Sequence, residues 1–401
     1  MRLLDPQGTF TYSVIRPLSD LFLWLWRLER RIEFLYRPQF DRHLRGLLFD
    51  SLQRVQNSLR TDEHLSLAEE KELPDEDRYT AEVIDEISKF IRENWLPGGA
   101  QRFGNTKTFG VLRAEFTVPD GLPTHLRHGL FATPGSYPAY VRFSGPGPYA
   151  PPDLEDFGQC SVAIKVMAVP GPKLMEDESA TQDLILVSPA SFVTPDIKEN
   201  SAMQRWVRAK APLGYLIDRR PFRLLHLAMQ LLYSPMHSNP LEVRYYSNVP
   251  FLLGEGQAVQ YSLAPVREGR TRIPVRPAEN YLRDAMVRTL TEGGWEMDFM
   301  VQVQTDPHLM PIEDATVHWP EDLSPYITVA RLRMPAQRFD SDGQLAFADV
   351  LRFNPWHSLP EHRPLGNSNR ARRTMYFELA QLRQSMNAVQ HVEPTGEETF
   401  A

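Results

Sequence analysis

The sequence predicts an α+β protein built around an antiparallel sheet. Eight strand-like segments follow residue 102, and a helical block is inserted late among them rather than one helix after each strand. This order argues against a doubly wound parallel sheet, in which strands and helices alternate. The chain also contains 34 prolines and 22 glycines, which favours many rigid connections over long continuous helices.

Size and charge narrow the class of protein. The 401 residues are 42% hydrophobic and 24% charged, as expected for a globular protein with one large domain or two modest ones. A net charge of −7 argues against nucleic-acid binding as the main task. The single cysteine, Cys160, excludes an internal disulfide and indicates a reducing, cytoplasmic location. No stretch reaches the roughly 20 apolar residues that span a bilayer.

The first 60 residues predict an amphipathic helical arm. Helical periodicity runs from residue 20 to residue 60, is broken at Pro38 and resumes at Leu44. The tryptophans and arginines of residues 21–37 suit peripheral contact with a membrane surface. The alternative is an arm packed on the body or on another subunit of a homo-oligomer, and Glu29 and Glu33 weaken the case for anionic lipid.

An acidic stretch separates this arm from the body. Residues 61–78 lose periodicity and carry six acidic side chains between residues 69 and 77, which predicts an exposed linker. We therefore divide the chain into an arm with its linker, residues 1–78, and a body, residues 79–401. The body opens with an amphipathic helix over residues 81–95, ended by a Pro-Gly-Gly sequence.

The rest of the body is read from its periodicity. Helices are expected at residues 197–232, 277–290 and 370–386. Strands are expected at residues 107–118, 137–145, 161–169, 182–187, 243–246, 257–263, 295–304 and 327–334.

The second of these strands contains an unexplained charge. Arg142 interrupts the aromatic and β-branched run of residues 136–145, where the other side chains suit a half-buried pleated surface. A charge in such a run needs a partner. The sequence does not say which group that partner is.

An ordered set of short motifs resembles the haem-dependent catalase superfamily, and within it the shortened catalase-like proteins. Order and spacing match over residues 102–373, although each motif alone is weak. The motifs are RFGNTK at 102–107, LRAEFTVPD at 112–120, YPAYVRFS at 137–144, AIKV at 163–166, TQD at 181–183 and HRPLG at 362–366.

The resemblance implies an antiparallel eight-stranded β-barrel with flanking helices and a bound haem. Carried over to this sequence, Arg102 and Arg363 match arginines that hold the propionates, and Arg142 belongs to the strand that lines the pocket. Ser144 and Phe192 match the small polar and aromatic residues beside the distal face. Buried guanidinium groups need anionic partners, which propionates would supply, whereas protein carboxylates are the alternative.

The sequence departs from the family at both faces of the haem. The family's distal histidine is replaced by Asn105, whose amide cannot take and return a proton, and the distal asparagine aligns with Val187. No tyrosine lies between residues 326 and 376, so the usual iron ligand is missing. An ungapped alignment places His357 at the metal-ligand position; anchoring on Arg352 places Trp356 there instead.

Two functions remain open from the sequence. One is a haem-dependent oxidoreductase acting on peroxide or on an organic or fatty-acid hydroperoxide, with Asn105 at the catalytic position. The other is a pseudoenzyme or binding protein that holds haem, or a lipid-like anion, without redox turnover. Loss of the distal histidine and of the tyrosine favours the second.

Overall fold

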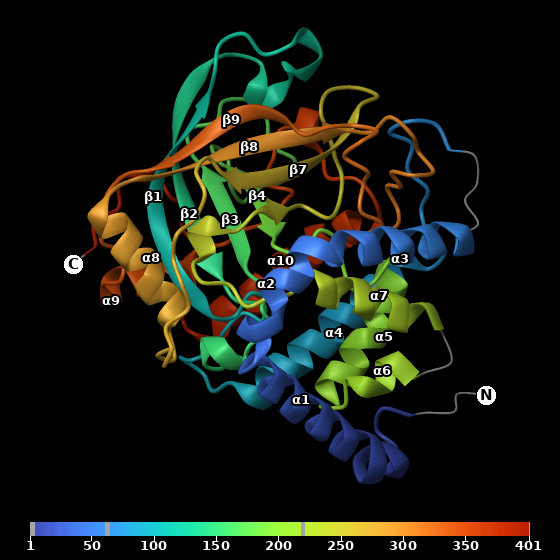
Figure 1. Cartoon of the computed structure of the whole chain (residues 1–401). Helices are drawn as coiled ribbons and strands as arrows, with labels where there is room; N and C mark the ends of the chain where they lie inside the picture. The colour runs from blue at the N-terminus through green and yellow to red at the C-terminus, as the bar shows by residue number, and fades with distance from the viewer. Residues whose placement is uncertain (1–4, 61–64, 218–220, 401) are drawn as a thin grey trace.

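The computed structural model describes residues 5–60, 65–217 and 221–400, and its centre is a closed β-barrel (Figure 1). Eight antiparallel strands form the ring, as the resemblance implied. They are β1 (Thr108–Val118), β2 (Gly135–Ser144), β3 (Ser161–Val166), β4 (Gln182–Val187), β5 (Tyr245–Tyr246), β7 (Ala258–Pro265), β8 (Trp295–Val303) and β9 (Ile327–Met334).

The ring runs in the order β5-β4-β3-β2-β1-β9-β8-β7 and closes where β5 pairs with β7. A further short strand, β6 (Phe251–Leu252), pairs with β7 outside the ring. The fifth strand is shorter than the expected span of residues 243–246, and β6 was not expected from the sequence.

Residues alternate between the two faces of the barrel wall. In β2, Val141 and Phe143 point into the main apolar core, whereas Tyr140 packs outside it with Val111 of β1. By the same period of two, Arg142 lies on the outer face. The strand therefore places its one buried charge outside the packed barrel interior.

Helices cover that outer face. On one side lie α8 (Tyr281–Glu292) and α9 (Asp342–Val350), the second of which was not expected from the sequence. On the other, α4 (Glu76–Asn94) packs against α5 (Ile197–Arg208) and α10 (Asn367–Met386) through a separate apolar cluster (Figure 1).

The helical interval expected over residues 197–232 consists of three helices. After α5 come the short α6 (Leu213–Ile217) and α7 (Pro221–Leu232). Pro212 and Pro221 stand at or next to the two helix starts, where a missing N–H is tolerated. Residues 218–220, within the predicted interval, lie outside the described residues.

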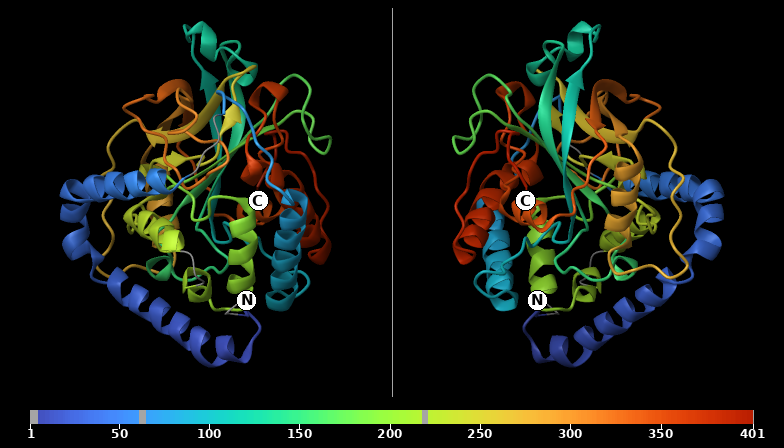
Figure 2. Two further views of the ribbon diagram at one scale, coloured as in Figure 1. Left: turned by 90° about the vertical axis from the view of Figure 1, so that its right-hand side faces the viewer. Right: turned by 90° about the vertical axis from the view of Figure 1, so that its left-hand side faces the viewer.

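The arm wraps around the outside of the body as a single-turn η1 (Thr11–Ile15), α1 (Arg16–Arg30), α2 (Glu33–His43) and α3 (Arg45–Leu59) (Figure 2). The inner face of the arm is held against the body by hydrogen bonds. Arg30 and Glu33 form a buried ion pair at 2.6 Å. Arg30 also donates to the Phe157 carbonyl, and Glu33 accepts from the Met236 N–H.

Two expectations about the arm and linker were wrong. Pro38 does not break the helix: α2 continues through it, and the turns fall instead after Arg30 and at Leu44. One missing N–H costs α2 a single hydrogen bond, while Arg37 ties the same turn to the carbonyls of residues 231 and 232. The acidic stretch is not wholly exposed, because Glu70 and Glu76 pair with Arg370 at 2.7 and 2.8 Å.

The helices of the described segments include none that combines the length and apolar character needed to cross a bilayer.

Candidate functional site

Arg142 is held on the outer face of β2 by neighbouring polar groups. Its Nη2 donates to the Asn105 carbonyl at 2.7 Å and to the Thr108 hydroxyl at 2.8 Å, and its Nη1 donates to Ser144 Oγ at 3.1 Å. The side chain is 2% exposed, and its Nε has no hydrogen-bond partner. These partners are neutral, so the charge that the sequence left unexplained has no anion bonded to it among the described residues.

Asn105 is fixed just before β1 in a left-handed backbone conformation, with φ of 54°. Its side-chain oxygen accepts a 2.6 Å bond from the Ser161 hydroxyl, and Ser161 pairs across the sheet with Val187. The two positions that depart from the family's distal pattern therefore lie close together. Neither an amide nor an aliphatic side chain can shuttle a proton near neutral pH.

Two more arginines meet the end of α9. Arg102 donates to the carbonyls of Ala348 and Leu351 at 2.8 and 2.6 Å. Arg383, from α10, donates to the Asp349 carbonyl and, at 3.4 Å, to the same Leu351 carbonyl. The last carbonyls of a helix are unpaired and carry partial negative charge, which favours cations at this end.

The three guanidinium groups crowd one another. Burial and the charge of Arg142 lower the pKa of Arg102 to about 9. Burial lowers the pKa of Arg142 to about 10, and burial together with the charge of Arg102 lowers the pKa of Arg383 to about 8. Asp349 opposes each shift, but its side chain is 72% exposed and lies 3.7 Å from Arg102. We call Arg102, Arg142 and Arg383 the arginine cluster.

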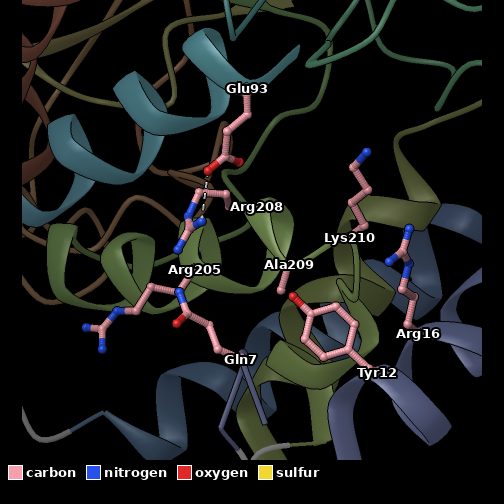
Figure 3. Close-up of a pocket in the computed structure, with 8 residues that line it drawn as sticks. All are labelled: Gln7, Tyr12, Arg16, Glu93, Arg205, Arg208, Ala209 and Lys210. Carbon is pink, nitrogen blue, oxygen red and sulfur yellow. Dashed lines mark hydrogen bonds and ion pairs between the residues drawn. The ribbon is translucent and has the colours of Figure 1, made fainter. Parts of the chain in front are cut away.

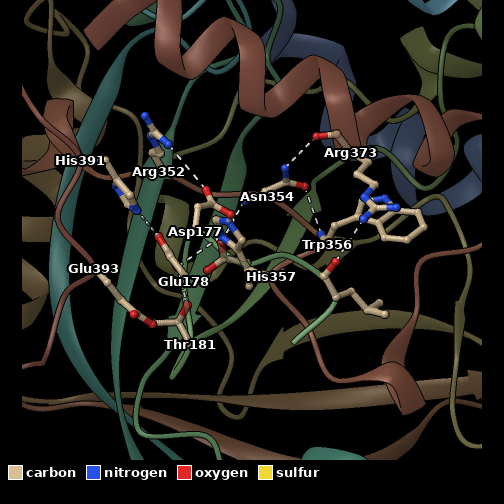
Figure 4. Close-up of polar contacts among 12 residues, drawn as sticks. Asp177, Glu178, Thr181, Arg352, Asn354, Trp356, His357, Arg373, His391 and Glu393 are labelled. Atoms are coloured by element: carbon tan, nitrogen blue, oxygen red, sulfur yellow. Dashed lines mark hydrogen bonds and ion pairs between the residues drawn. The ribbon is translucent and has the colours of Figure 1, made fainter. Parts of the chain in front are cut away.

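His357 lies in a separate, ionic site (Figure 4). Its Nδ1 is 2.9 Å from Asp183 and its Nε2 is 3.1 Å from Asp177. Burial lowers the pKa of His357, but its hydrogen bonds to the two carboxylates outweigh this effect and raise the pKa to about 9. The ring is therefore a buried imidazolium at neutral pH.

A lysine completes this ionic site. Lys165 Nζ contacts Glu178 and lies 2.7 Å from Asp183, and all three side chains are fully buried. His357 and these two carboxylates lie close enough to hold a metal ion. The ammonium group already sits between the carboxylates, so the cluster is an internal ion network that joins strands β3 and β4 to the loop at residue 357.

The described residues do not fit a haem iron at the expected position. An imidazole that ligates iron needs one ring nitrogen with a free lone pair. In the protonated His357 ring both nitrogens carry protons and donate them to the carboxylates of Asp183 and Asp177. The alternative, Trp356, donates its indole N–H to the Asn369 carbonyl at 2.6 Å. His357 is thus accounted for by protein contacts rather than by metal ligation.

Four of the expected site residues lie together and three do not. Arg102, Asn105, Arg142 and Ser144 gather at the arginine cluster. Arg363 is 35% exposed and pairs with Glu70 at 2.7 Å, and Phe192 packs on the barrel core. Arg363 therefore has a protein carboxylate as its partner, which was the alternative to a propionate.

Arg383 was missed from the sequence. It lies seven residues after Tyr376 and four after Leu379, on the face of α10 that was expected to point inward. A charged residue on the apolar face of a predicted helix was the sequence feature that could have revealed it. Its partner, the end of α9, could not be inferred because α9 itself was not expected.

A hollow of about 250 Å³ lies between the arm and α5 (Figure 3). It is smaller than most small-molecule pockets, and the two α5 arginines in its wall already pair with Glu82 and Glu86. It is distinct from the arginine cluster. Its lining is Gln7, Tyr12, Arg16, Glu93, Arg205, Arg208, Ala209 and Lys210.

Comparison with known proteins relates the chain to catalases through structure alone. No family model and no curated protein sequence matches it. A fungal catalase superposes with a TM-score of 0.57 at 15% identity, covering 85% of this chain and 70% of the catalase. Catalase A from Saccharomyces cerevisiae superposes with a TM-score of 0.55 at 15% identity, covering 81% of this chain and 67% of the catalase. A bacterial catalase superposes with a TM-score of 0.51 at 15% identity, covering 81% of this chain and 63% of the catalase. At this identity the likeness shows the fold, and this chain has the catalase fold.

Proposed function

We propose that this chain is a binding protein of the catalase fold, which holds a carboxylate-bearing ligand at the arginine cluster without redox turnover. The observation that carries the proposal is the excess positive charge buried there. Three guanidinium groups share helix carbonyls and neutral side chains, and the opposing carboxylate, Asp349, is mostly in solvent. A buried charge without a close anion is costly, and a ligand carboxylate would relieve that cost.

The chemistry of the cluster defines the ligand class. Guanidinium groups bind carboxylates through paired N–H donors, and the unpartnered Nε of Arg142 is one such donor. Tyr140, Val111 and Leu351, each at most 2% exposed, pack with α9 into an apolar cluster on the same outer face. A planar or lipid-like molecule that ends in a carboxylate suits this combination; haem, with its propionates, and a fatty acid both belong to this class.

A second candidate is a haem-dependent oxidoreductase acting on peroxide or a fatty-acid hydroperoxide. The catalase likeness and the match of Arg102 and Arg142 to family arginines favour it. Asn105 and the protonated His357 argue against it, because the first cannot relay a proton and the second has no lone pair for iron. We therefore rank it below binding without turnover.

Titration of the full-length protein with haemin and, separately, with a fluorescent fatty acid tests the proposal. At least one of them should bind, and Arg383→Gln and Arg102→Gln should each weaken that binding by about tenfold, as for loss of a charged hydrogen bond. Arg363→Gln is the matched control, because Arg363 pairs with Glu70 outside the cluster. Thermal melts establish that each variant is folded.

Two results would contradict the proposal. The first is that the folded protein binds neither haemin nor the fatty acid. The second is rapid turnover of hydrogen peroxide or a fatty-acid hydroperoxide by the haemin-loaded protein, which would establish the oxidoreductase instead.

A further inference from the structure

We propose that the outer face of the N-terminal arm docks on the surface of an anionic lipid bilayer. This inference does not depend on what the arginine cluster binds. It starts from the distribution of exposed apolar side chains: of the 28 large ones among the described residues, 17 lie within residues 10–59. Monomeric soluble proteins rarely gather so many in one region, and such patches mark interaction sites.

The apolar residues of α1 form an exposed stripe. Leu18, Leu21, Leu25 and Leu28 follow one another at intervals of three and four residues, and each is 47–51% exposed. The opposite side of the arm is occupied, since Ser19 and Arg30 are buried against the body. The stripe therefore faces away from the protein.

Exposed apolar side chains are also found on the other two helices of the arm, which point in different directions. They include Phe34 and Leu35 of α2 and Leu47 and Val55 of α3, and the arm bends around the body between these helices (Figure 2). A single partner helix follows only one straight seam. A bilayer surface can contact side chains from all three helices at once.

Aromatic side chains on this face suit the bilayer interface. Phe10, Tyr12, Trp24, Phe34 and Tyr36 are all more than 40% exposed. Tryptophan and tyrosine are enriched where hydrocarbon meets headgroups, because their rings are apolar and carry one polar group.

Charge favours an anionic bilayer. Residues 10–59 contain eight arginines, no lysine and five acidic residues, a net charge of +3, while the remaining 36 basic and 46 acidic residues give −10. Glu33 is paired with the buried Arg30, and Glu29 accepts a hydrogen bond from the Tyr36 hydroxyl. The negative charges of both are already counted in the net charge of +3. An anionic surface would attract the arm and repel the body.

Flotation of the full-length protein with vesicles tests this proposal. The protein should float with vesicles of phosphatidylcholine and phosphatidylserine and much less with phosphatidylcholine alone. The Leu21→Glu/Leu25→Glu double variant should bind at least about tenfold more weakly. Val275→Glu is the matched control, because Val275 is fully exposed on the body. Arg31→Glu should lower binding to the anionic vesicles roughly fivefold.

Tryptophan fluorescence gives an independent measurement. Trp24, at 57%, is the exposed tryptophan of the described chain, the other six being buried or half-buried. Its emission should shift to the blue on addition of anionic vesicles, and Trp24→Phe should remove the shift. Absence of vesicle binding would overturn the proposal. So would light scattering that shows a dimer which the double variant dissociates, because a second copy would then cover this face.

Discussion

His357 lies between two carboxylates that keep its ring protonated above neutral pH. The pKa of about 9 exceeds the ordinary value of 6.5, so the folded state binds a proton more tightly than the unfolded chain does. The ionic contribution of His357 is therefore complete below pH 6.5 and is lost as the pH rises through 9.

The free energy of unfolding should fall by up to about 3 kcal/mol between pH 6 and pH 10 on account of this one ring. His357→Gln, which cannot carry the charge, should be less stable at pH 6 and should show a flatter dependence. Urea unfolding at a series of pH values measures both. An unchanged pH slope in the variant would show that another group is responsible.

Lys165 is the second residue on which the ionic site depends. Lys165→Met should destabilise the fold by about 3–5 kcal/mol, since it leaves Glu178 and Asp183 buried without their cation. Adding Asp183→Asn should recover part of the loss. Denaturant unfolding of the single and double variants measures the coupling, and simple additivity would contradict the account.

At the scale of the element, the turn before α10 requires glycine. Gly366 has φ of +84°, and a Cβ there would lie 2.4 Å from the Ile312 carbonyl oxygen. This backbone contact cannot be relieved by rotating a side chain. It fixes the start of α10, the helix that carries Arg383 to the arginine cluster.

Gly366→Ala should therefore lower the free energy of unfolding more than a glycine-to-alanine change at a site where positive φ is the only source of strain. Gly98→Ala is the matched control, because Gly98 has φ of +85° with nothing within 4 Å of its Cβ position. We expect about 1–2 kcal/mol for Gly98→Ala and at least about 1 kcal/mol more for Gly366→Ala. Equal losses in thermal or urea unfolding would show that the contact is relieved at little cost.

The sequence predicted strands better than it predicted the helix that completes the site. The strands expected at residues 107–118, 182–187 and 327–334 are observed at residues 108–118, 182–187 and 327–334, because runs of apolar and β-branched residues suit a largely buried pleated wall. The nine-residue α9 has a glycine in its first turn and is held by packing on Val111 and Tyr140. Such tertiary stabilisation leaves little local signal.

The same contrast applies to the candidate site. Arg142 was recognisable because a charge stood in an apolar strand, and Arg102 and Ser144 followed from the motifs. His357 was assigned to iron because the sequence cannot show that Asp177 and Asp183 meet it from a distant loop and strand. Those contacts arise only when the chain folds.

At the scale of the whole molecule, the arm is part of the body's surface rather than a tethered appendage. The buried Arg30–Glu33 pair joins it to the body through the Phe157 carbonyl and the Met236 N–H. Glu33→Ala leaves Arg30 buried without its carboxylate, which costs several kcal/mol, about 3–5 by analogy with other buried pairs. Asp20→Ala, at an exposed position of α1, is the control.

We expect Glu33→Ala to loosen the arm before the barrel unfolds. Limited proteolysis should then cut within residues 16–59 faster than in the parent protein and in Asp20→Ala. Unchanged cleavage in this region would show that the pair contributes little to docking.

The ring of strands has one narrow join. β5 contributes two residues, which pair once with β4 and twice with β7, whereas β1 and β2 pair along ten positions. Local opening should thus begin at this join, and the amides of Tyr245 and Tyr246 should take up deuterium before those of β1. An opened ring would present the unpaired edges of β4 and β7 to other chains. Strand-to-strand aggregation on mild heating would then start there, well before the core is lost.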